Sequence, residues 1–161
     1  MELHFVHYMS KYKSITDALH DAKPISLAVL GVFFSLSKED NPLESVNSFE
    51  FVNLQPIVSE LRNLIRAGKP MQIKGSINLY RLIPKNKNFY SYHGSLTTPP
   101  CDEVVLWNVF STPIPVSERQ LKEFRRLKNH EGQPIEDNFR PVQLLGRREV
   151  VFFENVHVRK E

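Results

Sequence analysis

Two histidines near the start of the chain, with one glutamate beside them, are the first side chains that could do metal chemistry. His4 and His7 lie in Leu3–Tyr8, whose alternation of side chains has the period of a β-strand. On a strand these two histidines point to opposite faces, so they cannot both bind one metal. Glu2 shares the face of His4, where its carboxylate could accept a hydrogen bond from the imidazole, as the outer acceptors of metal-bound histidines do. Each histidine could equally be a hydrogen-bonded residue of the core.

A second candidate for chemistry is the segment Gly94–Pro100, which reads Gly-Ser-Leu-Thr-Thr-Pro-Pro. Two threonines followed by two prolines place hydroxyl groups on a stiff, extended backbone with little rotational freedom. Such a segment can hold a hydroxyl or a backbone N–H at a fixed distance from a reacting oxygen. Taken alone, it also fits a structural Thr-Pro turn.

The elements that must position these groups are mostly strands. Alternating or continuous apolar runs predict seven of them, at Leu3–Tyr8, Leu27–Leu36, Met71–Ile73, Ile77–Ile83, Phe89–His93, Val104–Phe110 and Glu149–Val156. Helical spacing and capping residues predict short helices at Ser14–Ala22, Leu54–Ala67 and Ser117–Leu127. The sequence therefore predicts a mainly β domain with short peripheral helices.

Composition limits the class of protein. The chain has 161 residues, 41% of them hydrophobic and 24% charged, with a net charge of +3, which suits one globular domain. Basic residues cluster at Arg119–Lys128 and again at Arg147–Arg148. A nucleic-acid surface would be a concentrated basic patch with interleaved aromatic residues, so we expect solvated faces of a helix and a turn and no nucleic-acid partner. No run approaches the length of a membrane span. The first residues do not form a signal peptide.

Four motifs, in one order, resemble the α-carbonic anhydrase family. Glu2–His7 is similar to the strand that carries the family's third zinc histidine, and Leu27–Phe33 is similar to its long buried strand. Tyr92 with Gly94–Pro100 is similar to its active-site threonine loop. Asp137–Gln143 is similar to its C-terminal motif, with Phe139 in place of tryptophan. Similarity extends from Glu2 to about Phe153. The resemblance implies part of that family's central twisted mixed β-sheet fold, with residues 1–161 as the C-terminal part of a single domain whose N-terminal portion is missing.

The resemblance also implies an activity, the reversible hydration of carbon dioxide to bicarbonate by a zinc-bound hydroxide. The zinc is held by three histidines. Matched position by position, His4 is the third zinc ligand and Glu2 accepts from its second ring nitrogen. Thr97 orients the hydroxide and Thr98 lines the polar side of the pocket. Asn138 supports a ligand histidine through its backbone.

The same match implies an apolar wall for carbon dioxide, formed by Val6, Val29, Leu96, Val105 and Trp107. Strand parity agrees with this assignment, since Val6 shares a face with His4 and Val105 shares one with Trp107. An apolar wall beside a polar metal site suits a small neutral substrate that becomes charged. The implied partners are carbon dioxide, bicarbonate, and sulfonamide or anion inhibitors.

The chain departs from the family pattern at the metal. The other two zinc histidines of the family, a His-x-His pair, lie upstream of the region that matches Glu2, and so do its proton-shuttle histidine and the glutamate that accepts from the threonine hydroxyl. The remaining histidines occupy unrelated contexts, at His20, His93, His130 and His157. One protein ligand would bind zinc weakly. We therefore expect the 161 residues to be inactive alone, and the natural protein to extend upstream of Met1.

Two other interpretations remain. The chain could be a non-catalytic, carbonic anhydrase-related binding protein or a truncated product, or an unrelated β-domain whose similarity is misleading. Cys101 is the single cysteine, and it could be a small buried thiol. It also matches a position where some secreted or membrane-attached members of the family have a disulfide-bonded cysteine, which favours an extracellular location. No Asn-x-Ser/Thr sequence adds support, so the compartment stays open.

Overall fold

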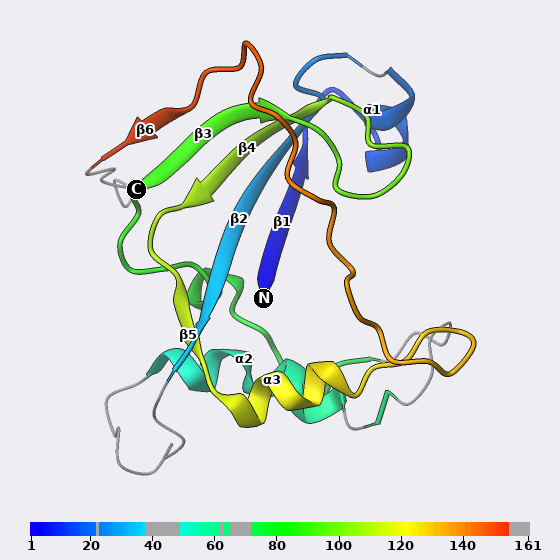
Figure 1. Ribbon diagram of the computed structural model, residues 1–161, viewed down its shortest axis with the longest axis vertical. Coiled ribbons are helices and arrows are strands. Elements are labelled where there is room, and N and C mark those ends of the chain that lie inside the picture. Colours follow the sequence, from blue (N-terminus) through cyan, green and yellow to red (C-terminus); the bar gives the residue numbers. More distant parts are fainter. Residues whose placement is uncertain (22, 38–48, 62, 65–71, 155–161) are drawn as a thin grey trace. The chain divides into compact units, whose positions relative to one another are not determined.

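The computed structural model describes residues 1–21, 23–37, 49–61, 63–64 and 72–154 (Figure 1). Its elements, in chain order, are β1 (Glu2–Tyr8), α1 (Ile15–Asp21), β2 (Leu27–Leu36), α2 (Phe49–Leu61), the 3₁₀ helix η1 (Leu79–Leu82), β3 (Phe89–Gly94), β4 (Val105–Phe110), β5 (Ile114–Val116), α3 (Glu118–Arg125) and β6 (Val151–Phe153). They form two compact units. The first unit comprises Met1–Phe33, Pro84–Pro113 and Phe139–Glu161, and the second comprises Phe34–Ile83 and Ile114–Asn138.

The first unit is built on a mixed β-sheet with the strand order β1-β2-β4-β3-β6 (Figure 1). The pairing of β2 with β4 is parallel, and the other pairings along this path are antiparallel. In the second unit the last residues of β2, from Phe34 to Leu36, pair with β5 in parallel. The predicted fold class, a mainly β structure with short helices, is confirmed.

The strand β2 lies between β1 and β4 in the sheet, and its sequence is apolar on both faces. Leu27 and Val29 are almost fully buried, as expected for a strand with neighbours on both sides. They belong to a core cluster of the first unit that also includes Ala18, Val104, Val105 and Trp107. The predicted strand Leu27–Leu36 is confirmed with the same bounds.

The helix α1 packs against this core through Ala18, which has no exposed surface. Ser14 caps it, as predicted, by accepting a hydrogen bond from the backbone N–H of Asp17 at 3.1 Å. At the other end, the hydroxyl of Tyr12 donates to the carboxylate of Asp21. Lys23 adds an ion pair to Asp21 at 3.2 Å. These contacts close the loop between β1 and β2.

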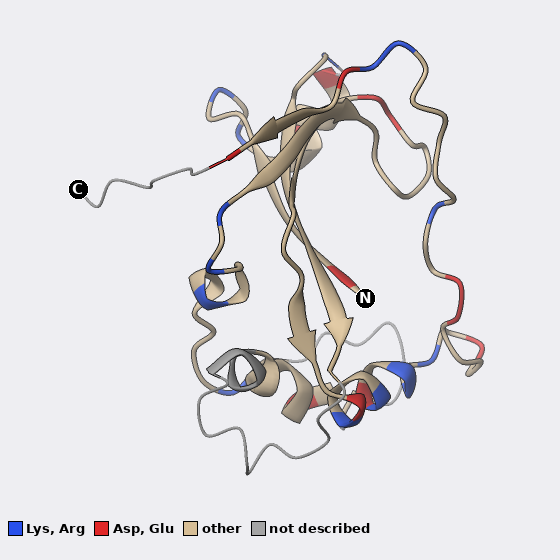
Figure 2. Cartoon of the chain, turned by 60° about the vertical axis from the view of Figure 1, so that its left-hand side comes forward, with Lys and Arg blue, Asp and Glu red and all other residues tan. Residues whose placement is uncertain are grey.

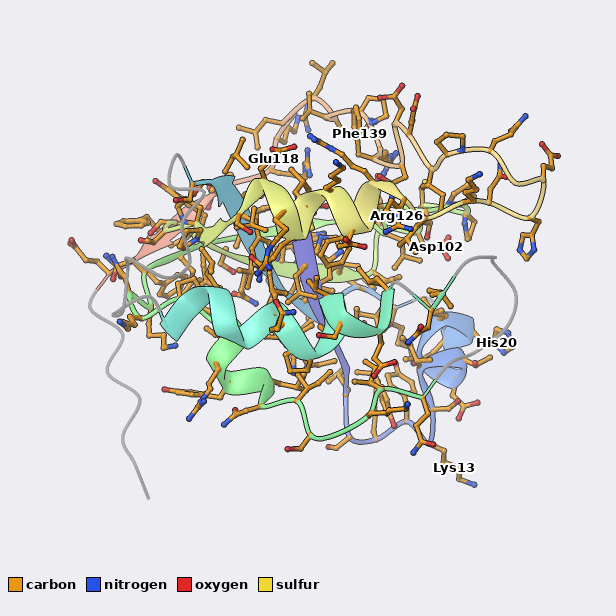
Figure 3. The ribbon with its side chains drawn as sticks, turned by 90° about the horizontal axis from the view of Figure 1, so that it is seen from below. Lys13, His20, Asp102, Glu118, Arg126 and Phe139 are labelled. Atoms are coloured by element: carbon orange, nitrogen blue, oxygen red, sulfur yellow. The ribbon has the colours of Figure 1, made fainter. Side chains whose placement is uncertain are left out.

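In the second unit, α2 and α3 lie side by side (Figure 3). The predicted capping box of α3 is confirmed, because the side chains of Ser117 and Gln120 each accept from the other's backbone N–H. Both basic and acidic residues occur along this helix (Figure 2). Arg125 pairs with Glu118 at 3.0 Å and Arg126 with Glu123 at 3.2 Å. Acidic partners therefore offset part of the predicted basic cluster.

Two predicted elements differ clearly from the structure, one in its bounds and one in its type. The predicted helix Leu54–Ala67 is α2, Phe49–Leu61, so Pro56 lies inside the helix and not in its first turn; the expected stop at Gly68 lies outside the described residues. The predicted strand Ile77–Ile83 contains η1 instead, because the Asn78 side chain accepts from the N–H of Tyr80 and caps a 3₁₀ turn.

The other differences are smaller. Residues 72–73, the described part of the predicted strand Met71–Ile73, do not form a strand. Within the predicted strand Glu149–Val156, the structure has the shorter strand β6, Val151–Phe153. The last two residues of the predicted strand lie outside the described residues. Among the described residues, no helix is both long enough and apolar enough to cross a membrane.

Candidate functional site

The register of the sheet brings His4 and most of the predicted apolar residues to one face. His4 pairs with Gly31, and Val6 pairs with Val29 on the neighbouring strand. Val29 in turn pairs with Trp107 on β4. Since directly paired residues share a face, these side chains lie on the same side of the sheet. The strand parities inferred from the sequence are therefore confirmed.

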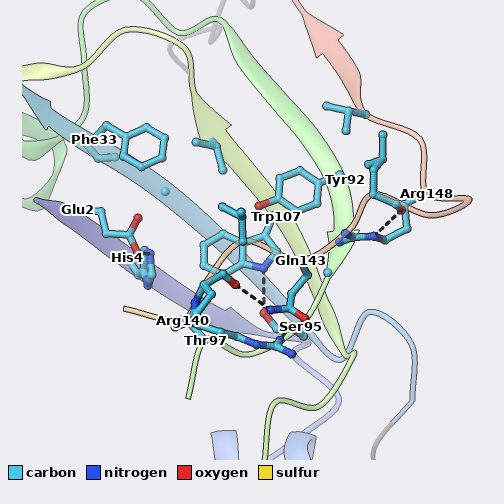
Figure 4. Close-up of a pocket in the computed structure, with 18 residues that line it drawn as sticks. Glu2, His4, Phe33, Tyr92, Ser95, Thr97, Trp107, Arg140, Gln143 and Arg148 are labelled. Atoms are coloured by element: carbon cyan, nitrogen blue, oxygen red, sulfur yellow. Dashed lines mark hydrogen bonds and ion pairs between the residues drawn. The ribbon is translucent and has the colours of Figure 1, made fainter. Parts of the chain in front are cut away.

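His4 and Glu2 contact each other on this face (Figure 4). The Nε2 atom of His4 lies 3.0 Å from Oε1 of Glu2, which is hydrogen-bond distance. The imidazole is about one-quarter exposed. With Nε2 facing the carboxylate, Nδ1 is the ring nitrogen that a metal could take, and the carboxylate fixes the orientation of the ring.

The threonine segment leaves the end of β3 and returns to the start of β4. Its base is closed by a hydrogen bond from the Leu96 N–H to the Asp102 carbonyl, at 2.9 Å. A second bond, from the Cys101 N–H to the Thr98 carbonyl at 2.9 Å, turns the chain across the two prolines. The segment is therefore a closed turn at its prolines, where the sequence suggested an extended backbone. Cys101 is a free, half-buried cysteine.

Side chains from two other segments hold the beginning of this loop, at Ser95. The indole N–H of Trp107 donates to the Ser95 carbonyl at 3.0 Å. The guanidinium of Arg140 donates to the Ser95 hydroxyl, and at 3.4 Å to the Leu96 carbonyl. Trp107, Arg140 and Ser95 lie close together in Figure 4. They fix the backbone immediately before Thr97.

A pocket of about 400 Å³ lies within the first unit, between the sheet and the segment after Phe139. His4, Glu2, Thr97 and Trp107 line it on one side (Figure 4). The segment after Phe139 contributes basic, amide and apolar side chains: Arg140, Val142, Gln143, Leu145 and Arg148. A histidine, a hydroxyl group and two guanidinium groups thus meet an apolar sheet surface, an arrangement that suits a small ligand.

The other predicted site residues lie in different surroundings. Val29 and Val105 are buried in the core cluster, and Leu96 packs against that cluster. Val6 is 47% exposed because β1 lies at the edge of the sheet. Thr98 is exposed beside Thr97, and Asn138 is exposed in the second unit. These positions do not by themselves assign a role.

The residues described here do not complete a zinc site. Across them, no group of three histidine, cysteine, aspartate or glutamate side chains is placed to hold a metal ion. His4 offers a single imidazole nitrogen, whereas catalytic zinc in proteins takes three protein ligands. The described residues thus fit one ligand position and its carboxylate acceptor.

Sequence reasoning missed Ser95 and Arg148. The backbone carbonyl and the hydroxyl of Ser95 both accept hydrogen bonds, and the residue type alone does not indicate such a role. Arg148 donates to three backbone carbonyls, those of Leu144 at 2.7 Å, Leu145 at 3.1 Å and His93 at 3.3 Å. Tyr92, on the same side of the pocket, has its pKa raised, mainly by burial of the phenol.

Comparison with known proteins identifies the family of the chain. The family model of eukaryotic-type carbonic anhydrase matches residues 1–154. Carbonic anhydrase 15 of Mus musculus is 33% identical over 99% of this chain and 48% of its own length. Carbonic anhydrase 3 of Bos taurus is 35% identical over 91% of this chain and 53% of its own length. Carbonic anhydrase-related protein of Homo sapiens is 34% identical over 92% of this chain and 50% of its own length.

The chain spans about half the length of these curated relatives. The match nevertheless covers the strand with His4, the buried strand β2, the threonine loop and the segment that carries Arg140, which together surround the pocket. The chain therefore belongs to the eukaryotic-type carbonic anhydrase family.

Proposed function

We propose that the complete protein hydrates carbon dioxide reversibly and that these 161 residues supply one zinc ligand and most of the substrate pocket. The observation that carries the proposal is the contact between His4 Nε2 and Glu2 Oε1 at 3.0 Å. A carboxylate that accepts from one ring nitrogen orients the other nitrogen and increases its basicity as a ligand. The same face of the sheet presents Val29 and Trp107, which supports a site for a small apolar substrate.

The remaining roles follow from position. The hydroxyl and backbone N–H of Thr97, at the pocket, would contact the charged oxygen of bicarbonate or of an anionic or sulfonamide inhibitor. Thr98 would extend that polar side. Val6, Leu96 and Val105 would complete the apolar wall with Val29 and Trp107. Asn138 would support a second ligand through its backbone.

The 161-residue chain alone is expected to lack this activity, because a single imidazole gives zinc neither the affinity nor the geometry of a three-ligand site. The test is stopped-flow hydration of carbon dioxide by the purified chain with added zinc. We expect no rate above the buffer control. Zinc-dependent hydration that a sulfonamide blocks would overturn this part of the proposal.

The activity of the complete protein is tested by mapping the 5′ end of the transcript and expressing its whole reading frame. His4→Ala should then abolish zinc-dependent hydration. His7→Ala, which alters a histidine on the opposite face of β1, should retain it. An intact longer protein that binds zinc but does not hydrate carbon dioxide would contradict the catalytic proposal.

A second candidate is a binding protein without catalysis, favoured by the similarity to the human carbonic anhydrase-related protein and by the single metal ligand in the described site. A genuine translation start at Met1 would support it. Zinc titration of the product of the mapped reading frame distinguishes the two candidates, because a catalytic site should bind one zinc ion tightly and a binding protein of this kind should not.

A further inference from the structure

Two independent contacts hold the beginning of the threonine loop, the segment Gly94–Pro100. From the sheet, the Trp107 indole donates to the Ser95 carbonyl at 3.0 Å. From the segment after Phe139, the Arg140 guanidinium donates to the Ser95 hydroxyl. The two donors therefore act on different atoms of one residue, and that residue lies two positions before Thr97.

Three groups close into a small network around Arg140. The Ser95 hydroxyl, which accepts from the guanidinium, also lies 3.0 Å from the Leu96 carbonyl and donates to it. The same guanidinium nitrogen reaches that carbonyl at 3.4 Å. A hydrogen bond from a charged donor is shorter and stronger than one between neutral groups. The positive charge of Arg140 thus bears directly on the peptide that joins Leu96 to Thr97.

We propose that Arg140 is a positioning residue that acts through Ser95 on Thr97. It fixes the backbone on which the Thr97 hydroxyl and N–H are presented to the pocket. The inference rests on the proposed function, since it assigns to Arg140 a part in presenting Thr97 to a substrate oxygen.

The packing around Gly94 restricts the loop in the same way. A Cβ atom added at Gly94 would lie 2.8 Å from Cδ1 of Trp107 and 3.2 Å from its Nε1. The indole can therefore approach the chain closely enough to reach the Ser95 carbonyl only because residue 94 is glycine. With the indole so placed, Arg140 supplies the restraint on the side chain of Ser95 that the indole does not.

Arg148 provides a matched control. It lines the same pocket and belongs to the same segment. Its guanidinium donates to the carbonyls of Leu144, Leu145 and His93, and none of these residues belongs to the loop from Ser95 to Cys101. Loss of Arg148 removes a guanidinium of equal charge from the pocket without touching the network at Ser95.

The test is amide hydrogen exchange in the complete protein without zinc, for the unmodified protein, Arg140→Met, Arg140→Lys and Arg148→Met. The Leu96 N–H, bonded within the loop, reports the loop. The Leu27 N–H, bonded to the Val104 carbonyl at 3.1 Å, reports the core. In Arg140→Met we expect Leu96 to exchange about 10-fold to 100-fold faster, from the typical worth of a hydrogen bond to a charged group, with a shifted Thr97 amide resonance and with Leu27 unchanged.

Arg140→Lys should recover part of the Leu96 protection, since an ammonium keeps the charge but not the fixed fork of donors. Arg148→Met should leave Leu96 and Thr97 as they are. The proposal would be overturned if amide exchange at Leu96 and Leu27 accelerates equally in Arg140→Met. It would also be overturned if Leu96 exchanges no faster in Arg140→Met than in Arg148→Met. If Arg140→Met does not fold, the comparison of Arg140→Lys with Arg148→Met decides.

A second arm measures the activity of the same complete protein with zinc. Arg140→Lys should lower kcat for hydration with little change in KM, because the apolar wall that receives carbon dioxide is intact. A change in KM alone would contradict a role through Thr97. The exchange measurement involves neither zinc nor carbon dioxide, so its failure leaves the proposed function standing. An inactive complete protein with the expected exchange pattern would contradict only the proposed function.

Discussion

The indole ring of Trp107 meets the imidazole of His4 edge-to-face, with ring centroids 4.8 Å apart and an angle of 73° between the ring planes. Such pairs have a preferred geometry and restrict both rings. The imidazole is thus held on one side by the Glu2 carboxylate and on another by the indole. Trp107 also donates to Ser95, so one side chain contacts both the candidate ligand and the threonine loop.

Trp107 is the sole tryptophan of the chain, so its fluorescence should report metal binding at His4. Titrating zinc into the 161-residue chain should change the emission only at high metal concentration, because one imidazole binds weakly. The cause is the new positive charge beside the indole. His4→Ala should remove the response. His7→Ala, on the opposite face of β1, should keep it, and an undiminished response in His4→Ala would contradict a metal at this position.

Gly94→Ala should destabilise the first unit by about 1–3 kcal/mol, the usual cost of overpacking. The new methyl group would lie 2.8 Å from the Trp107 ring, and the indole has little room to move because it is only 7% exposed. Gly31→Ala is the comparison, since its methyl group would lie 3.3 Å from a Val109 methyl and should cost less. Urea unfolding of both variants measures the difference. Equal losses would show that the contact with Trp107 is not the cause.

Tyr12→Phe should raise the pKa of Asp21. In the folded chain that pKa is lowered, chiefly by the hydrogen bond from the Tyr12 hydroxyl and further by Lys23. The measurement is carboxyl ¹³C chemical shift against pH. Tyr90→Phe, which removes a hydroxyl from a half-exposed tyrosine of β3, should leave the Asp21 titration unchanged.

The lowered pKa of Asp21 determines how the stability of the fold changes with pH. A carboxyl whose folded pKa is lowered stabilises the fold above its unfolded pKa, near pH 4, and loses that contribution as the pH falls through the folded value. The stability advantage of the unmodified chain over Tyr12→Phe should therefore be full at neutral pH and shrink in acid. Thermal unfolding at several pH values tests this. A difference that grows on acidification would contradict it.

Ser117→Ala should cost about 1 kcal/mol, the typical effect of removing a helix cap. The Ser117 side chain accepts from the Gln120 N–H at 3.2 Å, and Ser117 is 9% exposed, so water does not readily replace it. Faster amide exchange in the first turn of α3 is the expected readout. Ser59→Ala, an exposed site in α2, should have a much smaller effect.

Patterns that depend on neighbours along the chain could be read from the sequence. The strand β2 was predicted with its observed bounds because its apolar run leaves no polar face. The capping box at Ser117 was predicted because both partners lie within one turn. The shared face of Glu2 and His4 follows from strand parity, and the structure places the two side chains in contact.

Features set by residues far apart in the chain could not be read in this way. The missed 3₁₀ turn in Ile77–Ile83 is a different case, because it depends on a local cap from Asn78 in a segment with the apolar content of a strand. The contact of Arg140 with Ser95 joins two segments distant in sequence. The exposure of Val6 depends on the place of β1 at the sheet edge, which no local pattern indicates.

The parallel pairing of β2 with β4 has a consequence for the order of folding. Leu27 and its partner Val105 are separated by most of the middle of the chain, whereas β1 and β2 are separated only by residues 9–26, which include α1. On the ribosome, the β1–β2 pair can form early and must then wait with one long side of β2 unpaired until β4 emerges. Pairings of this kind are slow and leave a strand edge available to other chains. The edge of β2 that later pairs with β4 is therefore open to other chains while the residues between these two strands are synthesised.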